Sequence, residues 1–238
     1  MGRWWAIVVM LGVLASAGCD EPEAPELILL GHTPPVAPAC QPRAGQVTHS
    51  IMDLTLTERY TFHARLINAG PQDITLEQAT ISFVPPPNIS FVPPQNLRVP
   101  VQGIIPAGQE ATVPIELVPS QIGAQWAAAP EFAPGQRSSL TLLTELELQG
   151  STLGDGKVRT TGTFTFPVRL CGGCLVAYVP GTMGTDEDGS QTCQAQDGAS
   201  LSLPLVEPCE PGQDFDTDCR LCRVLYGDPE LADRVCDP

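Results

Sequence analysis

The sequence is short of positive charge, of aromatic residues and of long hydrophobic runs. Its 238 residues include 12 Lys and Arg against 27 Asp and Glu, which gives a formal net charge of −15, and Lys157 is the single lysine. Because binding to a phosphate backbone depends on neutralisation by cationic side chains, we do not expect a nucleic acid partner. Aromatic residues make up only 5% of the chain, whereas it contains 25 prolines. This balance argues against a helix bundle and favours β structure with many turns.

The apolar run near the N-terminus, residues 4–14, is too short to span a bilayer, which takes about 20 residues. Arg3 precedes it, and small residues follow it at 15–18. This order is typical of a secretory signal. We therefore expect residues 1–18 to be a signal peptide that is removed on export.

Residues 14–19, Leu-Ala-Ser-Ala-Gly-Cys, resemble the lipobox of bacterial lipoproteins, in which the cysteine becomes the lipid-modified first residue. Ser16 stands where that family usually has Leu, Val or Ile, and ordinary cleavage after Ala17 is the alternative. Nine cysteines are an odd number for an oxidising compartment, and lipidation of Cys19 leaves an even set of eight. We therefore expect a lipid anchor at Cys19 that attaches the protein to a membrane of the bacterial cell envelope, at the outer membrane or the periplasmic face.

The mature chain divides by composition into a tether, a β domain and a cysteine-rich segment. Residues 19–45 are rich in Pro, Ala and Glu, which predicts a semi-extended tether. Within it, the apolar residues 27–30 either dock on the domain or form an edge strand. Residues 46–170 alternate apolar and polar positions, which indicates half-buried strands. For residues 60–66 the predicted inward set is Tyr60, Phe62, Ala64 and Leu66.

Irregularities in this alternation predict local features of the strands. The apolar phase of residues 74–83 shifts near Gln78, which indicates a β-bulge, and Pro114 indicates an edge strand. Residues 158–170 are predicted as one long strand, joined through a hairpin at 150–156 to the strand before it. The sequence thus predicts an all-β fold, an antiparallel immunoglobulin-like sandwich of about seven strands, followed by an irregular disulfide-rich segment.

Two further patterns lie within the β domain. Residues 66–70 and 105–114 resemble the strand and Pro-x-Gly turn layout of bacterial Ig-like envelope modules and late-embryogenesis-type sandwiches. Residues 81–88, Ile-Ser-Phe-Val-Pro-Pro-Pro-Asn, are followed directly by a second copy at 89–96 that differs only in its seventh residue. The repeat is either a slipped duplication within a long loop or a proline-rich recognition loop.

Residues 171–238 hold seven of the nine cysteines, and 13 acidic against 3 basic side chains. Since this segment has few large apolar residues, we expect disulfides to substitute for a core. Zinc held by the two C-x-x-C motifs is the less favoured alternative, because the motifs lie far apart and export favours oxidation. We expect Cys40 to pair with Cys171 or Cys174. The eight predicted disulfide cysteines are Cys40, Cys171, Cys174, Cys193, Cys209, Cys219, Cys222 and Cys236.

Two acidic clusters are candidate calcium sites, although no calcium ion or other cofactor is required by the sequence. One contains Asp186 and Asp188, and the other contains Asp214, Asp216 and Asp218. The second begins like an EF-hand loop, but Cys219 replaces its glycine and Leu225 its bidentate glutamate, so it is not an EF-hand. The alternative to a looser calcium site is a solvated acidic loop.

The run 166–176, with Cys-Gly-Gly-Cys-Leu, and the later Cys-Glu-Pro-Gly-Gln-Asp at 209–214 resemble the C-terminal half of uncharacterised myxobacterial-type lipoproteins. That resemblance implies an envelope location and a two-part architecture, and no activity. The sequence has no nucleophile elbow, Walker loop or zinc-protease motif, and its three histidines are scattered. We therefore expect a non-enzymatic, lipid-anchored protein with a structural or binding role, whose partner is an envelope or extracellular protein or glycan. A calcium-dependent binding or adhesion module is the alternative.

Overall fold

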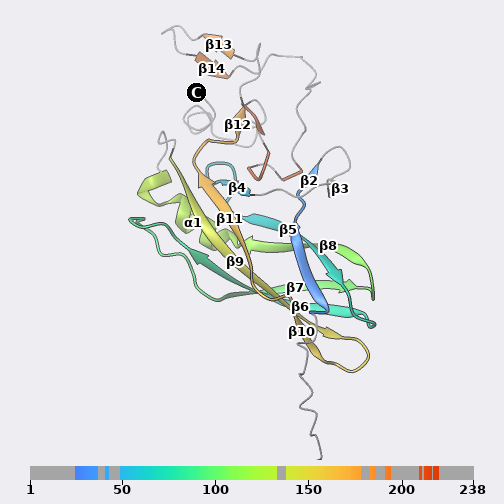
Figure 1. Ribbon diagram of the computed structural model, residues 1–238. Helices are drawn as coiled ribbons and strands as arrows, with labels where there is room; N and C mark the ends of the chain where they lie inside the picture. The colour runs from blue at the N-terminus through green and yellow to red at the C-terminus, as the bar shows by residue number, and fades with distance from the viewer. Residues whose placement is uncertain are drawn as a thin grey trace, which may run out of the picture.

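Two β-sheets enclose one hydrophobic core in the computed structural model of the protein (Figure 1). The structure describes residues 25–36, 41–42, 49–132, 138–177, 183–185, 191–193, 209–210, 212–215 and 217–219. The smaller sheet has the strand order β1 (Leu27–His32), β5 (Tyr60–Asn68), β8 (Glu110–Val118). The larger sheet has the order β4 (Ser50–Asp53), β11 (Phe164–Cys171), β9 (Ser139–Thr152), β6 (Ile74–Val84), β7 (Leu97–Ile105), and β10 (Val158–Thr160) pairs with β9.

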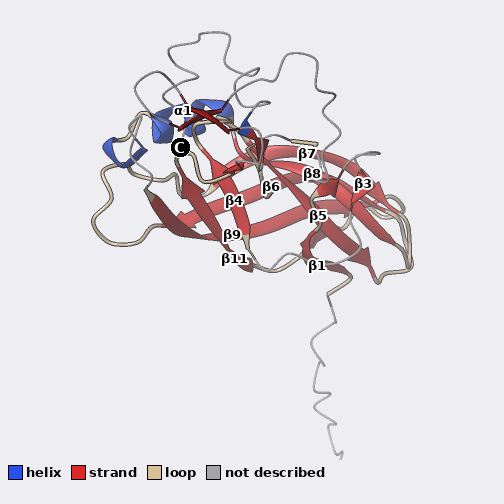
Figure 2. Ribbon diagram, turned by 90° about the horizontal axis from the view of Figure 1, so that it is seen from above, coloured by secondary structure: helices blue, strands red, loops and turns tan. Residues whose placement is uncertain are grey.

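Short elements complete the described chain. A helix, α1 (Ser120–Ala127), and a 3₁₀ turn (Pro130–Phe132) follow β8 (Figure 2). No helix among these residues is long and apolar enough to cross a membrane. The remaining strands pair in twos and are β2 (Pro35–Val36) with β3 (Gln41–Pro42), β12 (Val176–Ala177) with β15 (Thr217–Asp218), and β13 (Met183–Thr185) with β14 (Gln191–Cys193).

The all-β prediction is confirmed, and so are several of its details. The side chains of Tyr60, Phe62, Ala64 and Leu66 are all fully buried, as the alternation in β5 predicts. The register of β6 shifts between Leu76 and Gln78 against both of its neighbours, which is the predicted bulge. The proline-containing strand β8 lies at the edge of its sheet, where the missing N–H of Pro114 interrupts no ladder on a second side.

Three expectations about the strands need correction. The two sheets hold nine strands rather than about seven, and one of them is β1, the edge strand that was one of the two alternatives for residues 27–30. The sandwich is not wholly antiparallel, since β4 runs parallel to β11. The expected strand 158–170 is two strands. Between them Gly162 has a φ of +66°, and Thr161 hydrogen-bonds to Leu148 through its backbone N–H and its hydroxyl.

The repeat at 81–96 has a structural purpose. The two Asn residues that end the copies, Asn88 and Asn96, both have positive φ, at 68° and 55°. The two Phe residues, Phe83 and Phe91, both contact Trp126 of α1, with ring centroids 5.2 and 5.6 Å away. The second copy therefore repeats the aromatic contact of the first and packs helix α1 onto the core.

The strand directions give the sandwich two distinct ends. At one end β1 begins, and the connections at 69–73, 106–109 and 153–157 meet: Asp73 accepts hydrogen bonds from the backbone N–H groups of Leu153 and Ala107. We call this the N-terminal end. At the opposite end lie the connection between β6 and β7 at 85–96, α1 and the described parts of the cysteine-rich segment (Figure 1). We call this the cap end.

Candidate functional site

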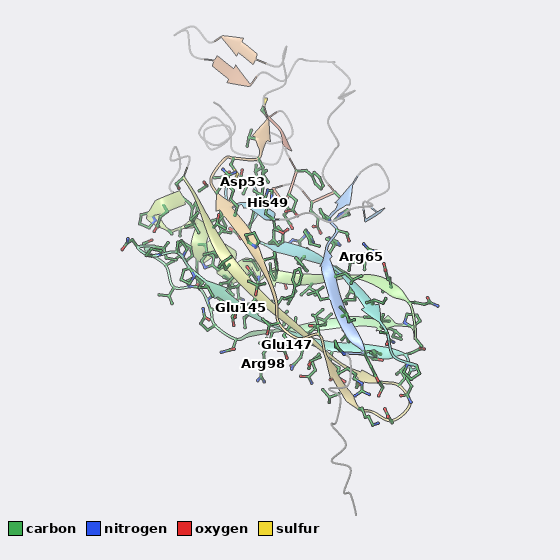
Figure 3. All side chains as sticks on the ribbon, viewed as in Figure 1. His49, Asp53, Arg65, Arg98, Glu145 and Glu147 are labelled. Atoms are coloured by element: carbon green, nitrogen blue, oxygen red, sulfur yellow. A yellow bond between two sulfur atoms is a disulfide. The ribbon has the colours of Figure 1, made fainter. Side chains whose placement is uncertain are left out.

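At the cap end, the side chain of Asp53 organises the turn that follows β11. Asp53 lies at the cap end of the sandwich (Figure 3). The parallel pairing of β4 and β11 places it beside Cys171, and its side chain is fully buried there. Oδ1 accepts hydrogen bonds from the N–H of Thr55 at 3.1 Å, the hydroxyl of Thr55 at 2.7 Å and the N–H of Gly173 at 2.8 Å. Oδ2 accepts one from the N–H of Leu175 at 2.9 Å. The turn from Cys171 to Leu175 thus wraps around one buried carboxylate.

The same turn is cross-linked, because Cys171 and Cys174 form a disulfide with each other. Neither is therefore available to Cys40, and the expected pairing of Cys40 with one of them is wrong. A three-residue separation brings two cysteines together without any distant partner, and this local solution is the one adopted. Cys209 and Cys219 are disulfide-bonded as well. Cys193 lies in β14, whereas Cys19, Cys40, Cys222 and Cys236 lie outside the described residues.

Donor atoms of Asp53, Cys171 and Cys174 lie within 4.8 Å of one another, a spacing that a metal ion could use. The chemistry of the donors points elsewhere. The two sulfur atoms are bonded to each other, and a disulfide sulfur is not the thiolate that zinc requires. The carboxylate already accepts four hydrogen bonds. In this oxidised form the cluster is a cross-linked turn.

The free edge of β4 is occupied by residues 212–214, which we call the docking segment. The N–H of Asp53 donates to the carbonyl of Gly212 at 2.9 Å, and the N–H of Asp214 donates to the carbonyl of Ile51 at 2.9 Å. The side-chain oxygen of Gln213 accepts from the N–H of Thr61 at 2.8 Å. The docking segment therefore bridges β4 of the larger sheet and β5 of the smaller one.

Glycine is required at position 212 of this segment. Its φ is +81°, and a Cβ there would lie 2.7 Å from the Cβ of Leu56. Any other residue would meet both backbone strain and a close contact. The glycine of the Gly-Gln-Asp sequence at 212–214 thus has a specific conformational reason.

The carboxylate of Asp214 enters the core and meets two side chains from the smaller sheet. Its Oδ1 accepts from the N–H of Ile51 at 2.8 Å, and its Oδ2 accepts from the hydroxyl of Tyr60 at 2.6 Å. The Nε2 atom of His32 lies 3.0 Å from the same Oδ2. We call Asp214, His32 and Tyr60 the Asp214 lock.

The hydrogen-bond network assigns the ring proton of His32. The Nδ1 atom accepts from the N–H of His63 at 3.0 Å, so the proton belongs on Nε2, where it is donated to Asp214. The carbonyl of His63, which lies 3.3 Å from Nδ1, already accepts from the N–H of Thr33 at 3.0 Å. The ring also stacks on Phe62, with centroids 4.5 Å apart.

The lock is closed to solvent. His32 is 2% exposed, the side chain of Asp214 4%, and Tyr60 is fully buried. Burial raises the pKa of Tyr60 well above its ordinary value of 10.0, and the negative charge of Asp214 raises it further. The phenol therefore keeps its proton and remains a hydrogen-bond donor to Asp214 throughout the physiological range.

A histidine, a carboxylate and a phenol in contact are also groups that carry out acid–base catalysis. Catalysis requires that one of them reach a substrate. Here each polar atom of the three side chains has a partner within the protein, and all three side chains are buried from solvent. The arrangement instead attaches the cysteine-rich segment to the sandwich. Glu210 adds a second contact, with its carboxylate 3.3 Å from Nε2 of His63.

Of the five candidate calcium ligands, Asp214 is the one whose side chain the structure describes. The carboxylate of Asp214 faces inward and is held by three protein donors, so it points away from any acidic cluster on the surface. Asp218 lies in β15, and its side chain is not described. Asp186, Asp188 and Asp216 lie outside the described residues, where a calcium site stays a prediction.

Sequence reasoning missed the residues that build the junction. Asp53 was not singled out by any sequence pattern, and His32 was one of three scattered histidines and lay in the predicted tether. The one sequence feature that could have identified them was the motif at 209–214, which resembles a motif of other lipoproteins but had no structural role assigned to it. The docking residue Gln213 and the buried acceptor Asp214 both belong to it. No protein-family model and no curated protein sequence matches this chain.

Proposed function

We propose that this is an exported, lipid-anchored protein of the bacterial cell envelope, with a non-enzymatic structural or binding role, and that its sandwich holds the acidic cysteine-rich segment away from the membrane. The observation that carries the proposal is that the chain enters the sandwich at one end and attaches the cysteine-rich segment at the other. The chain enters the sandwich at the N-terminal end, through β1, and the docking segment is locked at the cap end, beside the last residue of β1.

The dimensions of β1 support this arrangement. Its six residues are separated by five steps of about 3.3 Å, so the two ends of the strand lie roughly 17 Å apart. Cys19 precedes Glu26 by only seven residues. A lipid on Cys19 would therefore place the N-terminal end next to the bilayer and the cap end away from it.

The acidity of the cysteine-rich segment fits this orientation. Most of the net charge of the chain resides in residues 171–238, and anionic lipid headgroups repel such a segment. Display at the far end removes that repulsion and leaves the segment accessible to an envelope or extracellular protein or glycan. We further propose that the sandwich is of the immunoglobulin-like kind and that the protein belongs with the myxobacterial-type lipoproteins its C-terminal motifs resemble.

The anchor is tested by expressing the full-length precursor in a bacterial host and determining the mass of the mature N-terminus. We expect a chain that begins at lipid-modified Cys19 and that fractionates with membranes. The variant Cys19→Ser should lose both properties, while Cys174→Ser, which removes a cysteine at the cap end, should stay in the membrane fraction. An unmodified terminus at Gly18 would contradict the proposal, since it would show ordinary signal cleavage after Ala17.

A further inference from the structure

Apolar side chains are exposed at the N-terminal end of the sandwich. Ile104 of β7 is 57% exposed, Val158 of β10 58%, and Leu153 in the β9–β10 connection 59%. Soluble domains commonly expose single residues of this kind, so exposure alone carries little weight. The placement of these three is more informative.

The register of the larger sheet aligns these residues. Ile104 lies opposite Thr75, Thr75 lies opposite Ser151, and Ser151 lies opposite Val158. Neighbours in one row across a sheet point to the same face. Leu153 follows two residues after Ser151, and its N–H donates to the carbonyl of Asp73 at the same end. Ile104 and Val158 thus lie on one face of the larger sheet, at the two ends of a row that also contains Thr75 and Ser151, and we call Ile104, Leu153 and Val158 the apolar rim.

The incoming chain is attached directly beside this rim. The carboxylate of Glu26 lies 2.5 Å from Nε of Arg159, the residue after Val158. The carbonyl of Glu26 also accepts from the N–H of Ala69 at 2.6 Å. The chain therefore leaves the sandwich at a fixed point next to the rim. Seven residues from Glu26 to Cys19 extend at most about 3.6 Å each, or roughly 25 Å.

We propose that the apolar rim of Ile104, Leu153 and Val158 rests on the lipid surface into which the Cys19 anchor inserts. This inference rests on the proposed lipid anchor and adds an orientation to it. An acyl chain alone leaves the attached domain free to tumble, whereas a second, apolar contact defines which end faces the bilayer. The contact would keep the cap end directed outward.

The charges around the rim define the kind of lipid surface. The acidic side chains nearby are already engaged: Glu77 accepts from the hydroxyl of Ser151 at 2.6 Å, and Asp155 pairs with Lys157 at 3.2 Å. Asp73 is held by the N–H of Ala107. The charged groups near the rim therefore have no excess of positive charge that would attract anionic headgroups. The contact is therefore expected on zwitterionic lipid, through apolar burial rather than charge.

Lys157 allows a direct test, because it is the only lysine of the chain and is exposed beside Leu153 and Val158. Full-length lipidated protein is labelled with an amine-reactive, environment-sensitive fluorophore and reconstituted in phosphatidylcholine vesicles. We expect blue-shifted emission and strong quenching by a quencher carried near the lipid headgroups. The variant Lys157→Arg, treated identically, measures the signal from any other amine.

Substitutions at the rim sharpen the test. Leu153→Glu and Val158→Glu should abolish the blue shift and raise the rate of protein transfer between vesicles roughly tenfold, because each removes the burial of one apolar side chain. The matched control is Val92→Glu, at a side chain 93% exposed at the cap end, which should change neither quantity. Thermal unfolding of each variant checks that the fold is retained.

Two outcomes overturn the inference by itself, and a third overturns it together with the proposed function. Water-like emission from an anchored protein would show that the rim does not touch lipid, while the proposed anchor itself would stand. A blue shift that appears without vesicles and grows with protein concentration would show that a second copy of the chain covers the rim. Loss of membrane association with an unmodified Cys19 would instead contradict the proposed function, and this inference with it.

Discussion

Different interactions stabilise the two ends of the sandwich. At the N-terminal end, short connections meet through ordinary hydrogen bonds around Asp73, and apolar side chains are left exposed. At the cap end, a disulfide and two buried carboxylates, Asp53 and Asp214, organise the contacts. The difference follows from composition. A segment with few large apolar residues cannot attach itself by hydrophobic burial, so its polar groups enter the core and are satisfied there.

Removing the carboxylate of the lock should have the largest effect. Asp214→Ala leaves the hydroxyl of Tyr60 and the N–H groups of His32 and Ile51 without an acceptor, and should lower the free energy of unfolding by about 3–5 kcal/mol. The measurement is urea unfolding, with hydrogen exchange of residues 212–215 as a second readout. Asp73→Ala at the N-terminal end is the matched control and should cost less than about 1 kcal/mol. Equal losses at the two ends would contradict the proposed difference between them.

Opening the disulfide should have the next largest effect. The bond between Cys171 and Cys174 closes a loop of four residues, so the double substitution to serine should cost about 2 kcal/mol by the entropy of the unfolded chain. Reduction of the parent protein cannot replace this variant, because it opens other disulfides too. A loss well below this value would mean that hydrogen bonds to Asp53 hold the turn without the cross-link.

High pH provides a smaller and more specific test of the lock. Because the pKa of Tyr60 is raised in the folded protein, the unfolded chain loses the phenolic proton first, above about pH 10. Stability should then fall as the pH rises, by about 1.4 kcal/mol per pH unit for this group. Tyr60→Phe removes that part of the slope, while the other two tyrosines contribute equally to both proteins. Parallel pH profiles for the two proteins would show that Tyr60 is not buried against Asp214.

Calcium should have the smallest effect. The proposed function includes no calcium ion, and the carboxylate of Asp214 is held by protein donors, so we expect no shift in the unfolding temperature at millimolar calcium and no heat on titration. The variant Asp218→Asn serves as a comparison if a signal is seen. A calcium-dependent rise in stability would favour the alternative of a calcium-dependent binding module, built from the acidic residues other than Asp214.

Local patterns predicted those parts of the fold that depend on neighbouring residues. The alternation of residues 60–66, the phase shift at Gln78 and the proline in β8 each reflect a single strand, and the structure agrees with them. The break between β10 and β11 was missed because alternation continues through Gly162, whose positive φ accompanies the interruption; both strands pair antiparallel with β9, and the register shifts by one residue between them. The cysteine-rich composition likewise indicated disulfides, but the pairing of Cys171 with Cys174 was not among the expectations.

By itself, the sequence determined the β architecture, the acidity and the division into a strand-rich and a cysteine-rich part, because these follow from composition and short-range periodicity. Only the tertiary structure determined how the docking segment attaches to the sandwich. Asp214 meets Tyr60 across 154 residues and His32 across 182, and no local pattern links such positions. A polar side chain in a tether and another in an acidic loop become core residues only when two sheets and a docking segment enclose them together, since burial is a property of the assembled fold.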